Sequence, residues 1–181
     1  MLARLMHDHK HIAKLLTILS IKCNKLTAGE QINYNVVRDI VEYMQSYAEH
    51  SHHPLEDIIS EFYISKFSSP SSADLLLAEH EALSHASTSL MATLNLILND
   101  VVVPKEQLVL ELQSYVQLQR NHMEYEESSI FPKWRKTMSD SDWYAVSSMC
   151  NERLIDDPLF AESGAVLFEE LREYLATTDT D

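Results

Sequence analysis

The sequence predicts an all-α fold, an up-down-up-down four-helix bundle with extra helices at its C-terminal end. Glycine occurs only twice and proline five times in 181 residues, which disfavours the many turns of a β architecture. Apolar residues recur at spacings of three and four along four long segments, as in amphipathic helices. Because short connections join these segments, neighbouring helices are expected to run antiparallel. A chain of this length buries a core without needing disulfide bonds.

Each long helix is bounded by residues that favour a helix end. The first is predicted over residues 2–26 and stops before the segment "TAGE". The second covers 33–66 and ends at the serine–proline turn "SSPSS". The third covers 73–99, where "NDVVVP" breaks the pattern, and the fourth covers 104–136. The fourth begins with proline, a residue favoured in the first helical turn.

Two shorter helices are expected after the bundle, over residues 142–152 and 163–175. We expect both to pack on its outside. The chain is therefore divided into a bundle domain, residues 1–137, and a C-terminal helical extension, residues 138–181.

Composition excludes several classes of protein. The net charge of −14 disfavours nucleic acid as a partner, because phosphate binding depends on lysine and arginine. Cys23 and Cys150 form no Cys-x-x-Cys motif, so neither a disulfide framework nor a thiolate cluster is indicated. The N-terminal stretch "IAKLLTILSI" contains Lys14 and has no signal-peptide cleavage site. No apolar run reaches the roughly 18 residues of a membrane span. We expect a cytoplasmic protein that binds neither nucleic acid nor membranes.

The nine histidines separate into two groups by helical phase. Each long helix places one histidine on its predicted apolar stripe: His9, His52, His80 and His122. The other five fall off these stripes and are expected to be solvated: His7, His11, His50, His53 and His85.

Two glutamates extend the core-facing set. Glu56 and Glu126 follow His52 and His122 by four residues, which places each pair roughly 5–6 Å apart at Cβ. The first and third helices carry their histidine near the start, and the second and fourth carry it near the end. An antiparallel bundle brings these four places to the same end. A single histidine in a core is more often hydrogen-bonded to a neighbouring residue than bound to a metal. Two glutamates buried among these histidines, however, need cations to compensate their charge.

Some neighbouring residues leave alternatives open. Glu127 and Asp57 are expected to be solvated, although Glu127 replaces Glu126 if the fourth helix is distorted. Pro54 interrupts the second helix inside the motif and removes one backbone hydrogen bond to the His50 carbonyl. This proline is either incidental or splays the helix so that its ligands aim correctly.

The predicted ligands are His9, His52, Glu56, His80, His122 and Glu126. Six ligands exceed the four that a structural zinc ion takes. Two metal ions, each with two imidazoles and both bridged by the carboxylates, account for the set. Such ligands suit iron and leave coordination positions open. Manganese or zinc can replace iron on purification.

A ferritin-like carboxylate site is the competing architecture, and it needs Glu-x-x-His on two helices. Glu49 precedes His52 correctly, but Gln119 stands at the matching place in the fourth helix. This architecture is therefore rejected.

The segments "HHPLE" and "HMEYEESSIFP", together with His9 and His80, resemble the hemerythrin-like HHE cation-binding domain over about residues 1–137. The resemblance implies a bundle holding two non-haem iron ions with carboxylate and oxo bridges. Oxygen-carrying members have a further histidine where this chain has Ser84, and an aspartate five residues after the last histidine, where Glu127 stands. The ligand set is closer to that of bacterial repair-of-iron-centres proteins, which respond to nitric oxide and oxidative stress.

The resemblance implies a protein that binds or senses O2, NO or peroxide. Two alternatives use the same site: an iron donor in the repair of damaged iron–sulfur centres, and a di-iron enzyme that consumes peroxide or NO. The ligand set alone leaves open whether the chain is an enzyme, and it identifies no protein partner.

Overall fold

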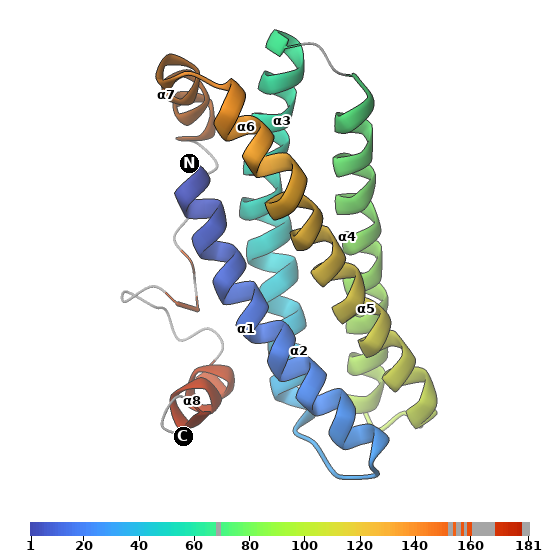
Figure 1. Ribbon diagram of the computed structural model, residues 1–181. Coiled ribbons are helices and arrows are strands. Elements are labelled where there is room, and N and C mark those ends of the chain that lie inside the picture. The colour runs from blue at the N-terminus through green and yellow to red at the C-terminus, as the bar shows by residue number, and fades with distance from the viewer. Residues whose placement is uncertain (68–69, 152–153, 155–156, 158, 161–168, 179–181) are drawn as a thin grey trace.

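The structure, a computed structural model, describes residues 1–67, 70–151, 154, 157, 159–160 and 169–178. Figure 1 shows long helical columns lying side by side, which confirms the predicted all-α fold class. Two of the columns are single helices, α1 (Leu2–Thr27) and α4 (Pro70–Leu98). No β-strand occurs in the described part of the chain.

The other two columns are each built of three consecutive pieces, of which the middle one is a π-helix. The first comprises α2 (Tyr34–Tyr43), η1 (Met44–His52) and α3 (His53–Phe67). The second comprises α5 (Lys105–Tyr125), η2 (Glu126–Ile130) and α6 (Phe131–Thr137). The outer bounds of all four columns agree with the predicted helices to within a few residues. The two π-helical pieces were not predicted.

Local chemistry explains where several helices begin. The Asn33 side chain accepts hydrogen bonds from the backbone N–H groups of Asn35 and Val36, which caps α2. Ser139 and Asp142 form a reciprocal capping box at the start of α7 (Asp140–Cys150). These caps satisfy backbone donors that a helix start leaves free.

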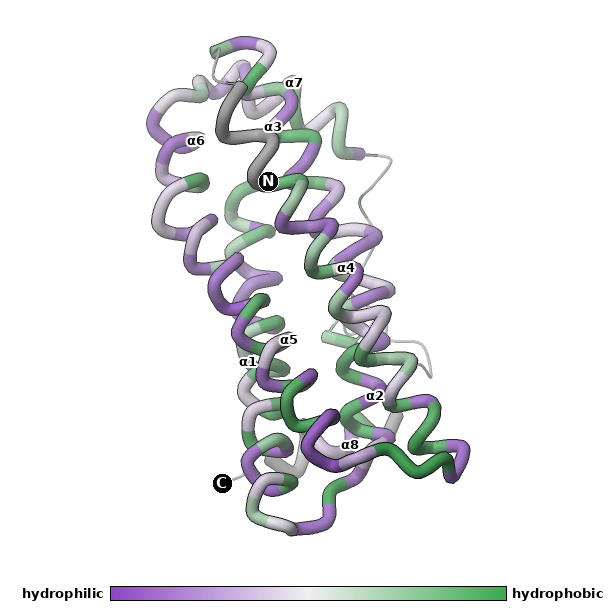
Figure 2. Tube along the Cα trace, turned by 90° about the vertical axis from the view of Figure 1, so that its right-hand side faces the viewer, coloured by the Kyte–Doolittle hydropathy of each residue, from purple (hydrophilic) through white to green (hydrophobic). Residues whose placement is uncertain are grey.

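The hydrophobic core has two parts along the bundle axis. Figure 2 shows hydrophobic and hydrophilic residues alternating along each helix, as in amphipathic helices. One part, nearer the α1–α2 connection, contains Leu16, Leu19, Ile40, Leu94 and Leu112. The other, nearer the N-terminus, contains Leu5, Leu55, Ile59, Phe131 and Trp134. In every column, the predicted metal ligands lie between residues of these two parts.

The described parts of the extension contact the bundle at several points. Helix α7 packs against α3, and α8 (Glu169–Thr178) packs against α2. Between them, the Tyr43 hydroxyl donates a hydrogen bond to Asp157 at 2.9 Å, and Phe160 stacks on His11 with ring centroids 3.9 Å apart. Residue 152, the predicted end of the first of these two helices, lies outside the described residues. So do residues 163–168, the predicted start of the second. The exact division into residues 1–137 and 138–181 remains a prediction.

None of the described helices is both long enough and apolar enough to cross a membrane.

Candidate metal centre

The bundle brings the six predicted ligands together in its interior. They come from all four columns, and none has more than 6% of its surface exposed: His9, His52, Glu56, His80, His122 and Glu126. The side chains that helical phase and level predicted to converge therefore lie together in the structure, and their role as metal ligands stays a prediction.

Glu56 lies between imidazoles from three columns. Its Oε1 atom is 3.2 Å from Nε2 of His52 and 3.7 Å from Nε2 of His9. Its Oε2 atom is 3.5 Å from Nε2 of His80. The carboxylate thus presents one oxygen to each side of the site.

Glu126 repeats this arrangement from the opposite column. Its Oε2 atom is 3.3 Å from Nε2 of His9. Its Oε1 atom is 3.4 Å from Nε2 of His122 and 3.8 Å from Nε2 of His80. Both glutamates therefore lie between imidazoles, with a different imidazole facing each of their oxygens.

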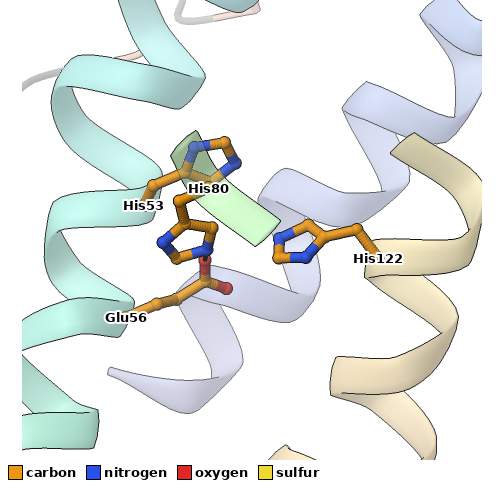
Figure 3. A group of neighbouring side chains, drawn as sticks. All are labelled: His53, Glu56, His80 and His122. Carbon is orange, nitrogen blue, oxygen red and sulfur yellow. Dashed lines mark ion pairs between the residues drawn. The ribbon is translucent and has the colours of Figure 1, made fainter. Parts of the chain in front are cut away.

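The side chains form two groups of potential metal ligands, and within each group the ligand atoms lie within 4.8 Å of one another. Glu56 belongs to both. The first group consists of His9, His52, Glu56 and Glu126. The second, shown in Figure 3, consists of His53, Glu56, His80 and His122.

A carboxylate fixes the outward-facing nitrogen of each predicted ligand histidine. The four Nδ1–oxygen pairs are His9–Glu127 at 2.8 Å, His52–Asp8 at 3.1 Å, His80–Asp57 at 2.9 Å and His122–Glu79 at 2.9 Å. Such a partner selects the ring tautomer that leaves Nε2 free to bind a metal, and it orients the ring. All four imidazoles are therefore held with Nε2 towards the two glutamates.

The expected roles of Glu127 and Asp57 need correction. Both are partly exposed, 42% and 32% by side chain, but each is paired with a ligand histidine rather than merely solvated. Glu126, which is completely buried, occupies the central position for which Glu127 was an alternative. Asp8 and Glu79 were not anticipated from sequence. Asp8 precedes His9 directly, and Glu79 precedes His80, so each lies beside one ligand while contacting another.

The protein atoms alone leave the centre unsatisfied. Within the described part of the chain, Nε2 of His9, His80 and His122 and both oxygens of Glu56 and Glu126 are buried without a hydrogen-bond partner. Buried polar atoms are rarely left in this state because desolvation is costly. Converging imidazole nitrogens and carboxylate oxygens are ligands that iron and related metals prefer. The residues present therefore fit a metal site.

The titration behaviour of the histidines supports the same conclusion. Burial alone lowers the pKa of His9, His52 and His80, but the facing carboxylates outweigh it. The pKa rises to about 10 for His9, about 9 for His52 and about 11 for His80. Burial likewise raises the pKa of Glu56, yet the surrounding imidazoles hold it well below its usual range. The site has a negative potential that attracts cations, either protons or metal ions.

Comparison with known proteins agrees with this geometry. A family model described as the hemerythrin HHE cation binding domain matches residues 1–134. The chain belongs to the hemerythrin HHE cation-binding domain family. A search among curated proteins found no match. The matched region ends within α6, so α7 and α8 follow the hemerythrin domain.

One sequence expectation about this hemerythrin domain was wrong. His53 was expected to be solvated, but only 4% of its surface is exposed, and it lies in the second ligand group. The π-helical segment η1 explains the error: the backbone N–H of His53 bonds to the carbonyl of Ala48, five residues earlier. In an α-helix, the residue one turn after Ala48 is His52. The π-helical hydrogen bond lengthens this turn by one residue, so His53 also lies on the buried side.

The second π-helical segment changes the fourth column in the same way. The backbone N–H of Phe131 bonds to the carbonyl of Glu126, also five residues earlier. Ser129, three residues after Glu126, is exposed, and Ile130 and Phe131 are buried instead.

A proline follows each π-helical segment at the same distance. Pro54 stands two residues after the end of η1, and Pro132 two residues after the end of η2. Proline lacks a backbone N–H and its ring crowds the carbonyl four residues earlier. A preceding π turn relieves this crowding because it shifts the carbonyls of the helix.

The remaining histidines lie outside the hemerythrin centre. His7, His50 and His85 are exposed as expected, and His11 is half-buried against Phe160. The ferritin-like alternative gains no support. Glu49 accepts a hydrogen bond from Ser87, Gln119 donates one to Tyr115, and neither belongs to a ligand group of the described chain.

A surface groove reaches the hemerythrin centre from the side of His9. It has a volume of about 500 Å³ and runs between α1 and the end of α5, lined by His9, Lys10, Ala13, Met123, Glu124, Glu127 and Ser128. His9 is only 1% exposed at its floor. The groove therefore approaches the first ligand group from the surface.

Proposed function

We propose that this hemerythrin-family protein binds two iron ions, one in each ligand group, and that the pair binds or senses O2, NO or peroxide. The observation that carries the proposal is the placement of Glu56 and Glu126. Each presents one carboxylate oxygen to either group, at 3.2–3.8 Å from the facing imidazole nitrogens. Two bridging carboxylates with imidazoles on both sides are suited to a metal pair rather than to one ion.

The residues of the chain have separable roles in this proposal. The two glutamates compensate the charge of both ions. The carboxylates of Asp8, Asp57 and Glu127 hold three of the imidazoles by their Nδ1 atoms. Iron with open coordination positions supplies the affinity for small redox-active ligands. The protein thus fixes the ligands in advance and leaves room beside them.

The surroundings of the site favour a small ligand. The site lies between the two parts of the hydrophobic core, and the Phe131 ring lies 5.2 Å from the His9 ring by centroids. The groove beside His9 leads from the surface towards the site, and His9 itself is almost completely buried. Because all the predicted ligands are buried, the site favours a diatomic molecule or peroxide over a bulky organic substrate.

Metal analysis combined with absorption spectroscopy tests the proposal. Protein purified without oxygen should contain about two iron ions per chain, and its visible spectrum should change reversibly with O2, NO or azide. Glu126→Ala should lose most of the iron, whereas the exposed-site control His85→Ala should retain it. Less than about one metal ion per chain, with stability unchanged by chelators, would contradict the proposal.

The same preparation distinguishes the alternative functions. Rapid transfer of iron to a weak chelator and to an apo iron–sulfur protein would indicate an iron donor. Sustained consumption of peroxide or NO, abolished in His122→Ala, would indicate an enzyme. Either result would replace binding or sensing as the main role of the site.

A further inference from the structure

His53 has the surroundings of a metal ligand rather than of an ordinary core residue. It is the first residue of α3 and follows the π-helical segment directly. The π turn buries both His52 and His53, which leave 1% and 4% of their surfaces exposed. Two adjacent residues of one regular α-helix would diverge by about a quarter turn. Here both imidazoles reach the interior, and they fall into different ligand groups.

The ring of His53 is placed against two other imidazoles. It stacks on the His80 ring with centroids 4.2 Å apart and an angle of 9° between the planes. It meets the His122 ring edge-on at 5.5 Å and 84°. Figure 3 shows these three rings gathered above the carboxylate of Glu56, with His53 and Glu56 coming from the same helix.

An ordinary buried histidine would satisfy its ring nitrogens by hydrogen bonds. The other four imidazoles of the centre each have a carboxylate on Nδ1. Among the hydrogen bonds found in the described residues, none involves the ring of His53. Stacking on His80 orients this ring instead, and a ring nitrogen lies within 4.8 Å of the ligand atoms of Glu56, His80 and His122.

We propose that His53 is a fifth imidazole ligand, which makes the two metal positions unequal. This inference rests on the proposed function. The position at His53, His80 and His122 has three imidazoles and both bridging glutamates, whereas the position at His9 and His52 has two imidazoles and the same glutamates. The three-imidazole position binds its ion more tightly and fills first. The two-imidazole position, on the side of the surface groove, exchanges its ion more readily.

Anaerobic titration of Fe²⁺ into the metal-free full-length protein tests the inequality. The wild-type protein should bind two ions in two separable steps. His53→Phe keeps a flat ring for stacking on His80 but removes the nitrogens. It should weaken the tighter step by at least tenfold and leave the other step within about twofold. His9→Phe should weaken the looser step instead, and His50→Phe, at an exposed position in the same column, should change neither.

The outcomes separate this inference from the proposed function. No iron binding by the wild-type protein would overturn both. Two steps in the wild-type protein that persist unchanged in His53→Phe would overturn the inference alone. If a folded His53→Phe variant binds both iron ions equally more weakly, His53 has a packing role. That result would also overturn the inference.

A second measurement needs no variant. In protein loaded with Zn²⁺ and labelled with ¹⁵N in its histidines, ring-nitrogen shifts distinguish metal-bound imidazoles from free ones. Five metal-bound imidazoles support the inference, and four contradict it.

Discussion

The buried carboxylate of Asp8 lies 3.1 Å from Nδ1 of His52, although 44 residues separate the two in sequence. The other oxygen of Asp8 accepts a hydrogen bond from the Tyr47 hydroxyl at 3.3 Å, and Arg4 donates to that hydroxyl at 3.2 Å. A chain of hydrogen bonds anchored in α1 thus holds a histidine of the second column. The residue next to Asp8, His9, enters the ligand group that contains His52.

We expect Asp8→Asn to weaken iron binding by roughly 10–100-fold, as removal of such outer carboxylates does at other metal sites. The amide keeps the shape of the side chain but loses the charge that fixes the His52 tautomer. Competition with a coloured Fe²⁺ chelator measures the change.

The matched control is Glu42→Gln, which removes a carboxylate from an exposed position of the same bundle. Its iron affinity should equal that of the wild-type protein. Equal affinities for Asp8→Asn and Glu42→Gln would show that the Asp8 carboxylate does not act on the metal centre.

Glu126 and Glu127 provide a second comparison, because adjacent carboxylates face different atoms. Glu126 is completely buried between two imidazole groups, whereas Glu127 is 42% exposed and contacts only the outer nitrogen of His9. We expect Glu126→Gln to lose most of the bound metal and Glu127→Gln to retain two ions with weaker binding of one. Metal content after gel filtration, measured by plasma mass spectrometry, checks both. A greater loss in Glu127→Gln than in Glu126→Gln would contradict the assignment of the bridging carboxylate.

Simple periodicity predicted the fold and most of the candidate site. The stripe in the first helix, from Leu5 through His9 to Leu26, is buried throughout. In the third column, His80 and Leu83 are also buried as predicted. These predictions of burial hold because α1 and α4 are regular α-helices, in which the direction of each side chain follows directly from residue spacing.

The errors lie where the backbone departs from the α-helix. A constant turn of 100° per residue cannot represent η1, so His53 was assigned to the solvent side. The same departure in η2 leaves Ser129 exposed and turns Ile130 and Phe131 inwards. The prolines that follow both segments were visible in the sequence, and each could have indicated a local change of helical register.

The outer carboxylates could not be found by periodicity either. Asp57 and Glu79 meet His80 and His122 across columns, at distances that depend on how two helices are rotated relative to each other. A single helical stripe contains no information about that rotation. Contacts between columns therefore required the structure.

Removal of the metal should destabilise the protein measurably. Without ions, the buried oxygens of Glu56 and Glu126 lack hydrogen-bond partners, which is costly. A ligand that binds only the folded state stabilises it by about 2.7 kcal/mol when present at a hundredfold excess over Kd.

We expect the Tm to fall on treatment with a chelator and to recover when Fe²⁺ is restored without oxygen. In Glu126→Ala, which lacks a bridging ligand, the chelator should change the Tm little. An identical fall in both proteins would mean that the chelator acts elsewhere.

The raised pKa values of the histidines predict how the metal-free protein responds to pH. In the folded state the pKa is about 9 for His52, about 10 for His9 and about 11 for His80, compared with 6.5 for an ordinary histidine. Below pH 6.5 these rings carry a proton in both the folded and the unfolded chain, so their stabilising contribution is complete. As the pH rises through 9 to 11, the folded protein loses these protons and the contribution disappears.

We therefore expect the Tm of the metal-free protein to decrease steadily from about pH 6.5 to pH 11. In the metal-loaded protein the ions replace the protons, so its Tm should change much less between pH 7 and pH 9. Differential scanning calorimetry of both forms across this range measures the difference. The variant His85→Gln, altered at an exposed histidine, controls for general effects of charge and should follow the wild-type curve. Parallel curves for the metal-free and metal-loaded proteins would contradict the prediction, because they would show that protons and metal ions do not compete for these imidazoles.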